Sequence, residues 1–126
     1  MTLQFLPEPD KPYFVTRFIG EVDDSQLFEY YRQVYTRPEL QPVKAEFADI
    51  SEADVTRVSA TGLAGLAAMI EEDFTSLGIE SLKTAVYTPD DMPFGLGRIY
   101  QVWSESSPEL VRVFRDRDKA IEWLSE

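Results

Sequence analysis

Carboxylates and hydroxyls are the side chains of this protein that could do chemistry, because its 126 residues include no histidine and no cysteine. The chain therefore lacks the commonest general base, the commonest transition-metal ligand and the thiolate nucleophile. Ser–His and Cys–His nucleophile pairs are excluded, and zinc is disfavoured. We expect a protein that is not an enzyme, with no catalytic residue, no metal and no cofactor.

Hydroxyls gather at the junction of residues 58–66, Val-Ser-Ala-Thr-Gly-Leu-Ala-Gly-Leu. This small-residue turn runs into an amphipathic helix, and a helix start offers unpaired N–H groups to an anion or a partner. Ser59, Thr61 and Gly62 are the candidate interaction residues, with a hydroxyl as candidate phosphoacceptor. A Ser or Thr here also caps the helix, which is worth about 1 kcal/mol, and capping is the favoured interpretation.

Acidic residues form a second set of candidates. Asp49 ends a predicted strand, and Glu21, Asp23 and Asp24 could join it in a Mg²⁺ site or in a phosphoacceptor site like that of receiver domains. Receiver domains begin with a βα unit, whereas two strands precede the first helix here. Loop carboxylates are usually solvated or cap helices, which is the favoured interpretation.

The run of residues 94–98, Phe-Gly-Leu-Gly-Arg, is a candidate ligand-binding segment. Two glycines inside a helical pattern cost roughly 1 kcal/mol each relative to alanine, so they require a packing or a binding reason. The binding interpretation uses Phe94, Gly95 and Gly97, with Arg98 as an anion clamp. Tight helix–sheet packing is the favoured interpretation. The run lacks the third glycine of a dinucleotide fingerprint.

Composition limits the partners. The formal net charge is −11, from 23 acidic and 12 basic residues, which disfavours nucleic acid and anionic membrane surfaces. A hydrophobic share of 44% is typical of a globular domain. No apolar run reaches the roughly 20 residues of a membrane span, and the N-terminus lacks a signal-peptide pattern. We expect one domain over residues 1–126, a cytoplasmic location, no nucleic-acid partner and no membrane insertion.

Patterning predicts the elements that position these residues. Strands are expected at residues 3–6, 13–19, 43–50, 82–88 and 110–114, and helices begin near Asp23, Ser59, Asp90 and Asp116. Residues 51–57 are expected to be a polar loop. The order ββαβαβαβα predicts a single α/β domain with a mixed, mainly parallel five-stranded sheet and about four helices. We expect helices to cover one face of the sheet fully and the other in part.

Apolar spacing predicts which faces are buried. The predicted core stripes of the first three helices are Leu27, Phe28, Tyr31, Val34 and Tyr35; Leu63, Leu66, Ala67, Ile70 and Phe74; and Met92, Leu96, Ile99 and Trp103. Lys44 and Glu46 alternate with apolar neighbours, which predicts a strand with one face more solvated than the other.

This element order, with a strand–loop–[Ser/Thr]-Gly-Leu–helix junction in the middle, resembles the STAS domain, the SpoIIAA-like fold of bacterial anti-sigma-factor antagonists. The matching residues are Phe47-Ala48-Asp49-Ile50 and, after a loop, residues 59–66. Residues 94–98 and 113–124 resemble an uncharacterised bacterial branch of this superfamily, which is often grouped with CRAL-TRIO-like lipid-binding folds. The resemblance spans nearly the whole chain in element order.

In antagonists the junction reads Asp-Ser-[Ser/Thr]-Gly-Leu, and a partner kinase phosphorylates the serine after the aspartate. This chain has Ser59 at the aspartate position and Ala60, which cannot take a phosphate, at the acceptor position. Phosphorylation of Ser59 or Thr61 instead stays an open alternative. The junction favours a non-enzymatic regulatory or protein-interaction module, with a protein partner or a self-associated dimer. The alternative function is to bind a small apolar ligand or a lipid in a pocket under the helix of residues 94–103. A weaker alternative is that the protein is a receiver-like phosphoacceptor.

Overall fold

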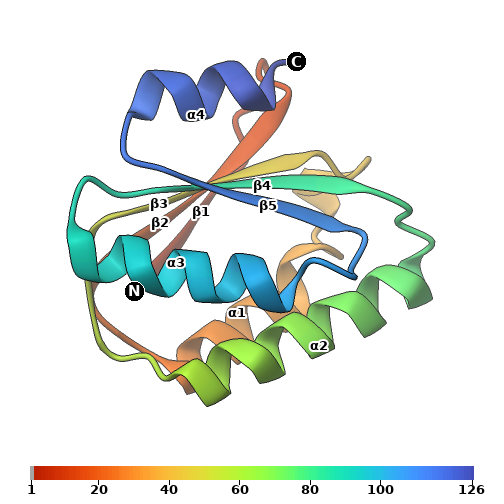
Figure 1. Ribbon diagram of the computed structural model, residues 1–126. Coiled ribbons are helices and arrows are strands. Elements are labelled where there is room, and N and C mark those ends of the chain that lie inside the picture. The colour runs from red at the N-terminus through yellow and green to blue at the C-terminus, as the bar shows by residue number, and fades with distance from the viewer. Residues whose placement is uncertain (1) are drawn as a thin grey trace.

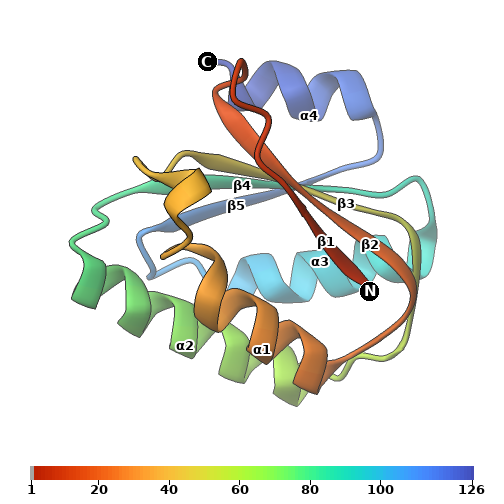
Figure 2. The ribbon, with the colours of Figure 1, turned by 180° about the vertical axis from the view of Figure 1, so that it is seen from behind.

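A five-stranded sheet with helices on both faces organises the protein. The structure is a computed structural model that describes residues 2–126. Its elements are β1 (Leu3–Leu6), β2 (Tyr13–Asp23), α1 (Asp24–Val34), a short 3-10 helix η1 (Pro38–Leu40), β3 (Ala45–Arg57), α2 (Ala60–Leu77), β4 (Leu82–Tyr87), α3 (Asp91–Trp103), β5 (Glu109–Phe114) and α4 (Arg117–Leu124). Helices α1, α2 and α3 lie on one face of the sheet and α4 lies on the other (Figure 1, and from behind in Figure 2).

The strands lie in the sheet in chain order, from β1 to β5. β1 runs antiparallel to β2, and every later pair of neighbours is parallel. Parallel neighbours need a crossover, and α1, α2 and α3 supply three crossovers of one hand, which places them on the same face. The predicted α/β class, element order, mixed sheet and four helices are confirmed.

Local sequence signals fix where the helices begin and end. Asp23 and Gln26 form a reciprocal capping box at the start of α1, with N···O distances of 2.8 and 3.0 Å. Ser59 caps α2, and Gly78, with a φ of 72°, closes that helix in the left-handed conformation that glycine adopts without strain. No helix within residues 2–126 is long and apolar enough to span a bilayer.

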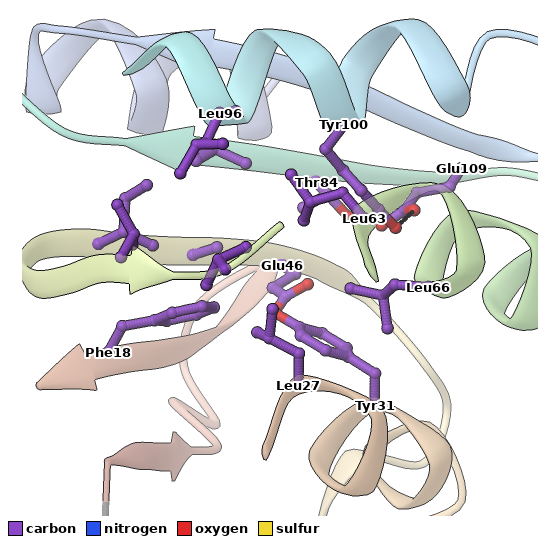
Figure 3. Close-up of a pocket in the computed structure, with 16 residues that line it drawn as sticks. Phe18, Leu27, Tyr31, Glu46, Leu63, Leu66, Thr84, Leu96, Tyr100 and Glu109 are labelled. Atoms are coloured by element: carbon purple, nitrogen blue, oxygen red, sulfur yellow. Dashed lines mark hydrogen bonds between the residues drawn. The ribbon is translucent and has the colours of Figure 1, made fainter. Parts of the chain in front are cut away.

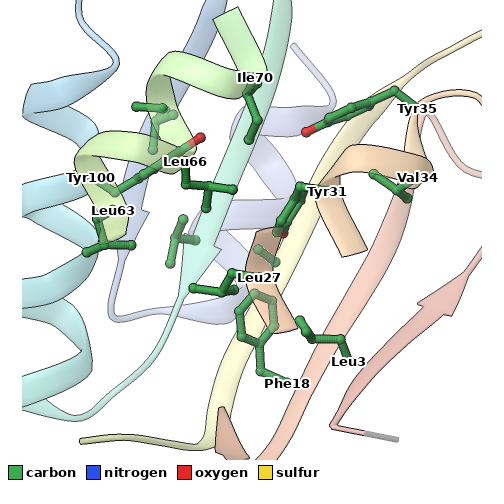
Figure 4. Packing of buried hydrophobic residues seen from close by; sticks show 14 of the residues in the cluster. Leu3, Phe18, Leu27, Tyr31, Val34, Tyr35, Leu63, Leu66, Ile70 and Tyr100 are labelled. Atoms are coloured by element: carbon green, nitrogen blue, oxygen red, sulfur yellow. The ribbon is translucent and has the colours of Figure 1, made fainter. Parts of the chain in front are cut away.

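The larger core lies between the sheet and α1, α2 and α3 (Figure 4). The predicted stripe of α2 is buried throughout. The same core contains Leu27, Tyr31 and Val34 of α1 and Tyr35, the residue after this helix. The rings of Tyr35 and Phe74 meet edge to face at 4.8 Å, which joins the two helices. A smaller core under α4 packs Trp123 and Leu124 against the opposite face of the sheet.

The middle strands are longer than predicted. Pairing of β2 with β3 continues to Asp23↔Arg57, so residues 51–57 are strand and the predicted loop is wrong. Polar residues there alternate along the strand with inward-facing residues such as Val55, which is buried. The pairing has register shifts between Arg17 and Ile19 and between Glu21 and Asp23, and Gly20, with a φ of 71°, lies between them.

The predicted buried stripe of α3 is wrong except at Leu96, which is partly buried and packs against the core. Pro93, Gly97 and Tyr100 face the sheet, whereas Met92 and Trp103 are 56% and 55% exposed. Gly97 allows close packing there: a Cβ at this position would lie 3.1 Å from Cγ1 of Val113, which would have to move to make room. The most apolar face of α3 therefore points away from the sheet.

Candidate functional site

The sheet and the three helices on one of its faces surround a cavity of about 80 Å³ that is partly open to solvent (Figure 3). Most of its wall is apolar, including Phe18, Leu27, Leu63, Leu66 and Leu96. A cavity of about 150 Å³ in another protein is large enough for benzene. This one has room for a smaller molecule or for one end of a longer molecule.

Glu46 of β3 is one of the residues that line this cavity, and it has no solvent exposure (Figure 3). Its Oε2 accepts hydrogen bonds from Thr16 Oγ1 and from the Tyr31 hydroxyl, both at 2.7 Å. The Tyr30 hydroxyl lies 2.6 Å from Thr16 Oγ1, and it is the donor of that pair because the Thr16 hydrogen goes to Glu46. Oε1 of Glu46 is buried and has no hydrogen-bond partner.

Glu109, the first residue of β5, is the second acid of the cavity and is 3% exposed. Its Oε1 accepts from the Tyr100 hydroxyl at 2.5 Å, and its Oε2 accepts from Thr84 Oγ1 at 2.8 Å. Thr84 is the β4 partner of Glu46 in the strand register, so this threonine lies between the two acids. Each carboxyl thus receives one tyrosine and one threonine donor.

Burial makes both acids hold their protons more tightly. It raises the pKa of Glu46 to about 7, against the opposing effect of the bonds from Thr16 and Tyr31, and the charge of Glu109 adds to the rise. Burial also raises the pKa of Glu109. A buried carboxylate is costly without a cation, and no lysine or arginine lines the cavity. Near neutral pH, Glu46 is therefore close to half-protonated.

Sequence reasoning missed both acids. Glu46 was expected on the more solvated face of its strand, and that prediction is wrong because β3 lies in the middle of the sheet with helices over both faces. Glu109 stands just before the strand predicted at residues 110–114, which begins at Glu109. A glutamate set between alanine and phenylalanine in a central parallel strand was the available signal, and parallel strands are usually apolar on both faces.

The junction residues lie at the exposed start of α2. Ser59 and Thr61 are exposed, and Ser59 Oγ accepts from Gly62 N at 2.9 Å as the predicted cap. Ser59 also donates through its N–H and its Oγ to the carboxylate of Asp24, at 3.0 and 2.7 Å. A Cβ at Gly62 would lie 2.2 Å from Asp24 Cγ, so the glycine is what admits this carboxylate. Ala60, like its neighbours, is exposed.

Asp49 does not join the other acidic candidates. It lies within β3 rather than at its end, and its carboxylate is 3.8 Å from Arg117 of α4, on the opposite face of the sheet from α1. Asp23 caps α1, and Asp24 accepts a hydrogen bond from Ser59. Glu21 pairs with Arg57 at 2.9 Å. Within residues 2–126 no three acidic side chains are close enough together to hold a metal ion.

The run 94–98 divides between two sides of α3. Gly97 packs against the sheet and lines the cavity, whereas a Cβ at Gly95 would meet nothing within 4 Å. Arg98 is exposed. The Phe94 ring is covered by the Arg115 guanidinium at 4.1 Å, a cation–π contact. The structure therefore does not bring Phe94, Gly95, Gly97 and Arg98 together as one site.

A mixed sheet with strands in chain order, three helices on one face and one on the other defines a SpoIIAA-like α/β domain. The solved structure of an uncharacterised protein of the DUF3478 family from Shewanella loihica PV-4, described as having a SpoIIAA-like fold, is similar with a TM-score of 0.55. The two are 17% identical in sequence, over 97% of this chain and 91% of the other. The predicted SpoIIAA-like fold is confirmed, and the likeness extends to fold alone. No protein-family model and no curated protein matches the sequence.

Proposed function

We propose that this protein binds a small, mainly apolar molecule in the cavity between its sheet and α1, α2 and α3. The observation behind the proposal is that Glu46, whose buried Oε1 has no hydrogen-bond partner within residues 2–126, is among the residues that line a mostly apolar cavity. Buried polar atoms are almost always hydrogen-bonded, so a molecule in the cavity would supply the missing partner. Apolar pockets with a few convergent polar groups are the usual form of small-molecule sites.

The position of the cavity supports the same proposal. Part of its wall is formed by Leu96, Gly97 and Tyr100 of α3. This is the helix under which the sequence analysis expects a pocket for an apolar ligand. Burying apolar ligand surface against that wall contributes about 25 cal/mol per Å². The mouth admits a ligand without unfolding of a helix, because the cavity is already partly open.

Native mass spectrometry of protein purified under mild conditions tests whether a ligand is present. We expect a second, heavier species that is lost on gentle heating. A direct test uses butan-1-ol as a probe and follows backbone amide signals by NMR. The Leu63 and Leu96 amides should shift, because both residues line the cavity.

Ala48→Leu is the matched cavity-filling variant, since Ala48 lines the cavity and is buried. Filling real empty space stabilises a protein by about 0.5–2 kcal/mol, so Ala48→Leu should unfold at a higher temperature and no longer bind the probe. Ala68→Leu, on the exposed side of α2, is the control and should leave probe binding unchanged. If butan-1-ol shifts the same amides in Ala48→Leu, the cavity is not its binding site.

A second candidate function is that of a protein-interaction module, with α2 as the docking element. The exposed hydroxyls of Ser59 and Thr61 at a helix start held by Asp24 support it. Thr61→Arg should weaken recovery of a stoichiometric partner from native extract, whereas Thr75→Arg, exposed near the other end of α2, should not. Equal recovery with both variants would rule out docking at this corner.

Self-association would use a different surface, the outward apolar face of α3. Met92, Ile99, Val102 and Trp103 are exposed there, and apolar faces of this kind are typical of interfaces. Sedimentation of Trp103→Glu beside the parent protein tests this. A dimer that persists unchanged in Trp103→Glu would exclude the α3 face as its interface.

A further inference from the structure

We infer that the cavity takes an organic cation: a small primary amine whose ammonium group lies against Oε1 of Glu46 and whose apolar part lies among the leucines. This inference rests on the proposed function and names the chemical class of its ligand. Three features of the site carry it, namely its charge balance, its hydrogen-bond donors and its size.

Within residues 2–126, the cavity is lined by two acids and no base. Glu46 and Glu109 line it, and no lysine or arginine does. The ionisable groups around Glu46 are tyrosines and one acid, Glu109 from β5. The tyrosines are Tyr30 and Tyr31 from α1, Tyr35 just after α1 and Tyr100 from α3. A bound cation would supply the counter-charge that the protein itself omits, whereas a carboxylate or phosphate ligand would meet two acids and no positive group.

Arg37 is the cation that acts on this region from outside. It pairs with Glu39 at 3.5 Å, stacks on the Phe5 ring at 4.6 Å and lines no part of the cavity. The charge near Glu46 is therefore left uncompensated by the fold. The net charge of −11 adds a long-range field that favours positive ligands over negative ones.

The hydrogen bonds that the two acids already accept indicate the same class of ligand. Thr16 and Tyr31 donate to Oε2 of Glu46, and Thr84 and Tyr100 donate to Glu109. Of the side-chain oxygens that are buried without a partner in residues 2–126, Oε1 of Glu46 is the one that belongs to a residue lining the cavity. An ammonium group has three donors and no acceptor, and its bonds to a carboxylate are about twice as strong as neutral ones.

Size limits the ligand to a few heavy atoms inside the cavity. A volume of about 80 Å³ is roughly half that of the cavity that holds benzene. The first few atoms of a short alkyl amine fit this space, and the rest of the chain extends through the open side of the cavity. n-Butylamine is therefore the probe, and butan-1-ol and butyrate are its neutral and anionic analogues.

The test is a titration of the three probes into the parent protein at pH 8, followed by NMR shifts of the cavity amides. We expect n-butylamine to bind at least tenfold more tightly than butan-1-ol and butyrate to bind most weakly. Equal affinities for amine and alcohol would overturn the cation inference and leave the proposed function standing. If no probe shifts the Leu63 and Leu96 amides, both proposals fall. A preference for butyrate overturns the inference as well.

Glu46→Gln tests the named contact. It keeps the shape of the side chain and removes its charge, so the preference for amine over alcohol should fall by about tenfold. Glu72→Gln, exposed on α2, is the control and should keep the full preference. An unchanged preference in Glu46→Gln would place the amine elsewhere and overturn the inference.

A second measurement needs no variant. If the ammonium pairs with ionised Glu46, binding at pH 6.5 must expel the proton that the carboxyl holds. Calorimetry in buffers of different ionisation enthalpy measures that release, and we expect proton release for the amine and none for the alcohol. Amine binding without proton release would overturn the inference.

Discussion

The buried acid at Glu46 should make the protein less stable as the pH rises through neutrality. The pKa of this carboxyl is about 7 in the folded protein, compared with 4.5 for an ordinary glutamate. A difference of about 2.5 pKa units corresponds to about 3 kcal/mol, at 1.36 kcal/mol per unit. Since the folded state holds the proton more tightly, this contribution is fully present below pH 4.5 and is lost as the pH rises through 7.

Urea unfolding between pH 4.5 and 8.5 measures this effect. The free energy of unfolding of the parent protein should fall by about 3 kcal/mol more than that of Glu46→Gln over this interval. Glu109 contributes a fall of the same sign in both proteins, because burial raises its pKa too, so the difference between the two curves isolates Glu46. Glu72→Gln should follow the parent curve, since Glu72 is exposed.

Parallel curves for the parent protein and Glu46→Gln would refute the reasoning, because they would mean that Glu46 titrates alike in the folded and unfolded states. A parent protein that gains stability between pH 5 and 8 would refute it in the opposite sense. That result would require a cation beside the carboxylate, and none lines the cavity.

Two further predictions concern glycines. Gly97→Ala should be at least about 1 kcal/mol less stable than Gly95→Ala in chemical denaturation, because a methyl at position 97 meets Val113 at 3.1 Å and one at position 95 meets nothing. Gly62→Ala should cost about 1–3 kcal/mol by displacing Asp24, and that cost should disappear in an Asp24→Ala background if the clash is its cause. An equal cost in both backgrounds would mean that the strain lies in the backbone.

Much of the fold is predictable because short-range chemistry sets it. The predicted Ser59 cap is confirmed, and the Asp23–Gln26 capping box and the left-handed Gly78 are equally local features. The buried stripe of α2 follows from spacing alone. The prediction of a loop at residues 51–57 failed because these residues form a strand through their pairing with β2, which the segment's own sequence does not indicate.

The buried acids of the cavity were not predictable for a related reason. Glu46 is recognisable as a buried acid only when β3 is known to lie between β2 and β4, with Tyr31 and Thr16 in reach. These partners are 15 and 30 residues away in sequence. The prediction of the buried face of α3 failed in a similar way. The helix packs closely against the sheet at Gly97, and Trp103 stays exposed although burying it would remove more apolar surface from water.

The bond between Asp24 and Ser59 has a consequence for the two regions described above. Val58 forms part of the cavity wall, and Ser59, the next residue, anchors the outer corner of α2 to α1. An occupant that displaced Val58 by a fraction of an ångström would pull on this anchor. Binding in the cavity would thereby change the exposed start of α2, where the hydroxyls lie. The contact between Asp24 and Ser59 would couple the buried cavity to this surface.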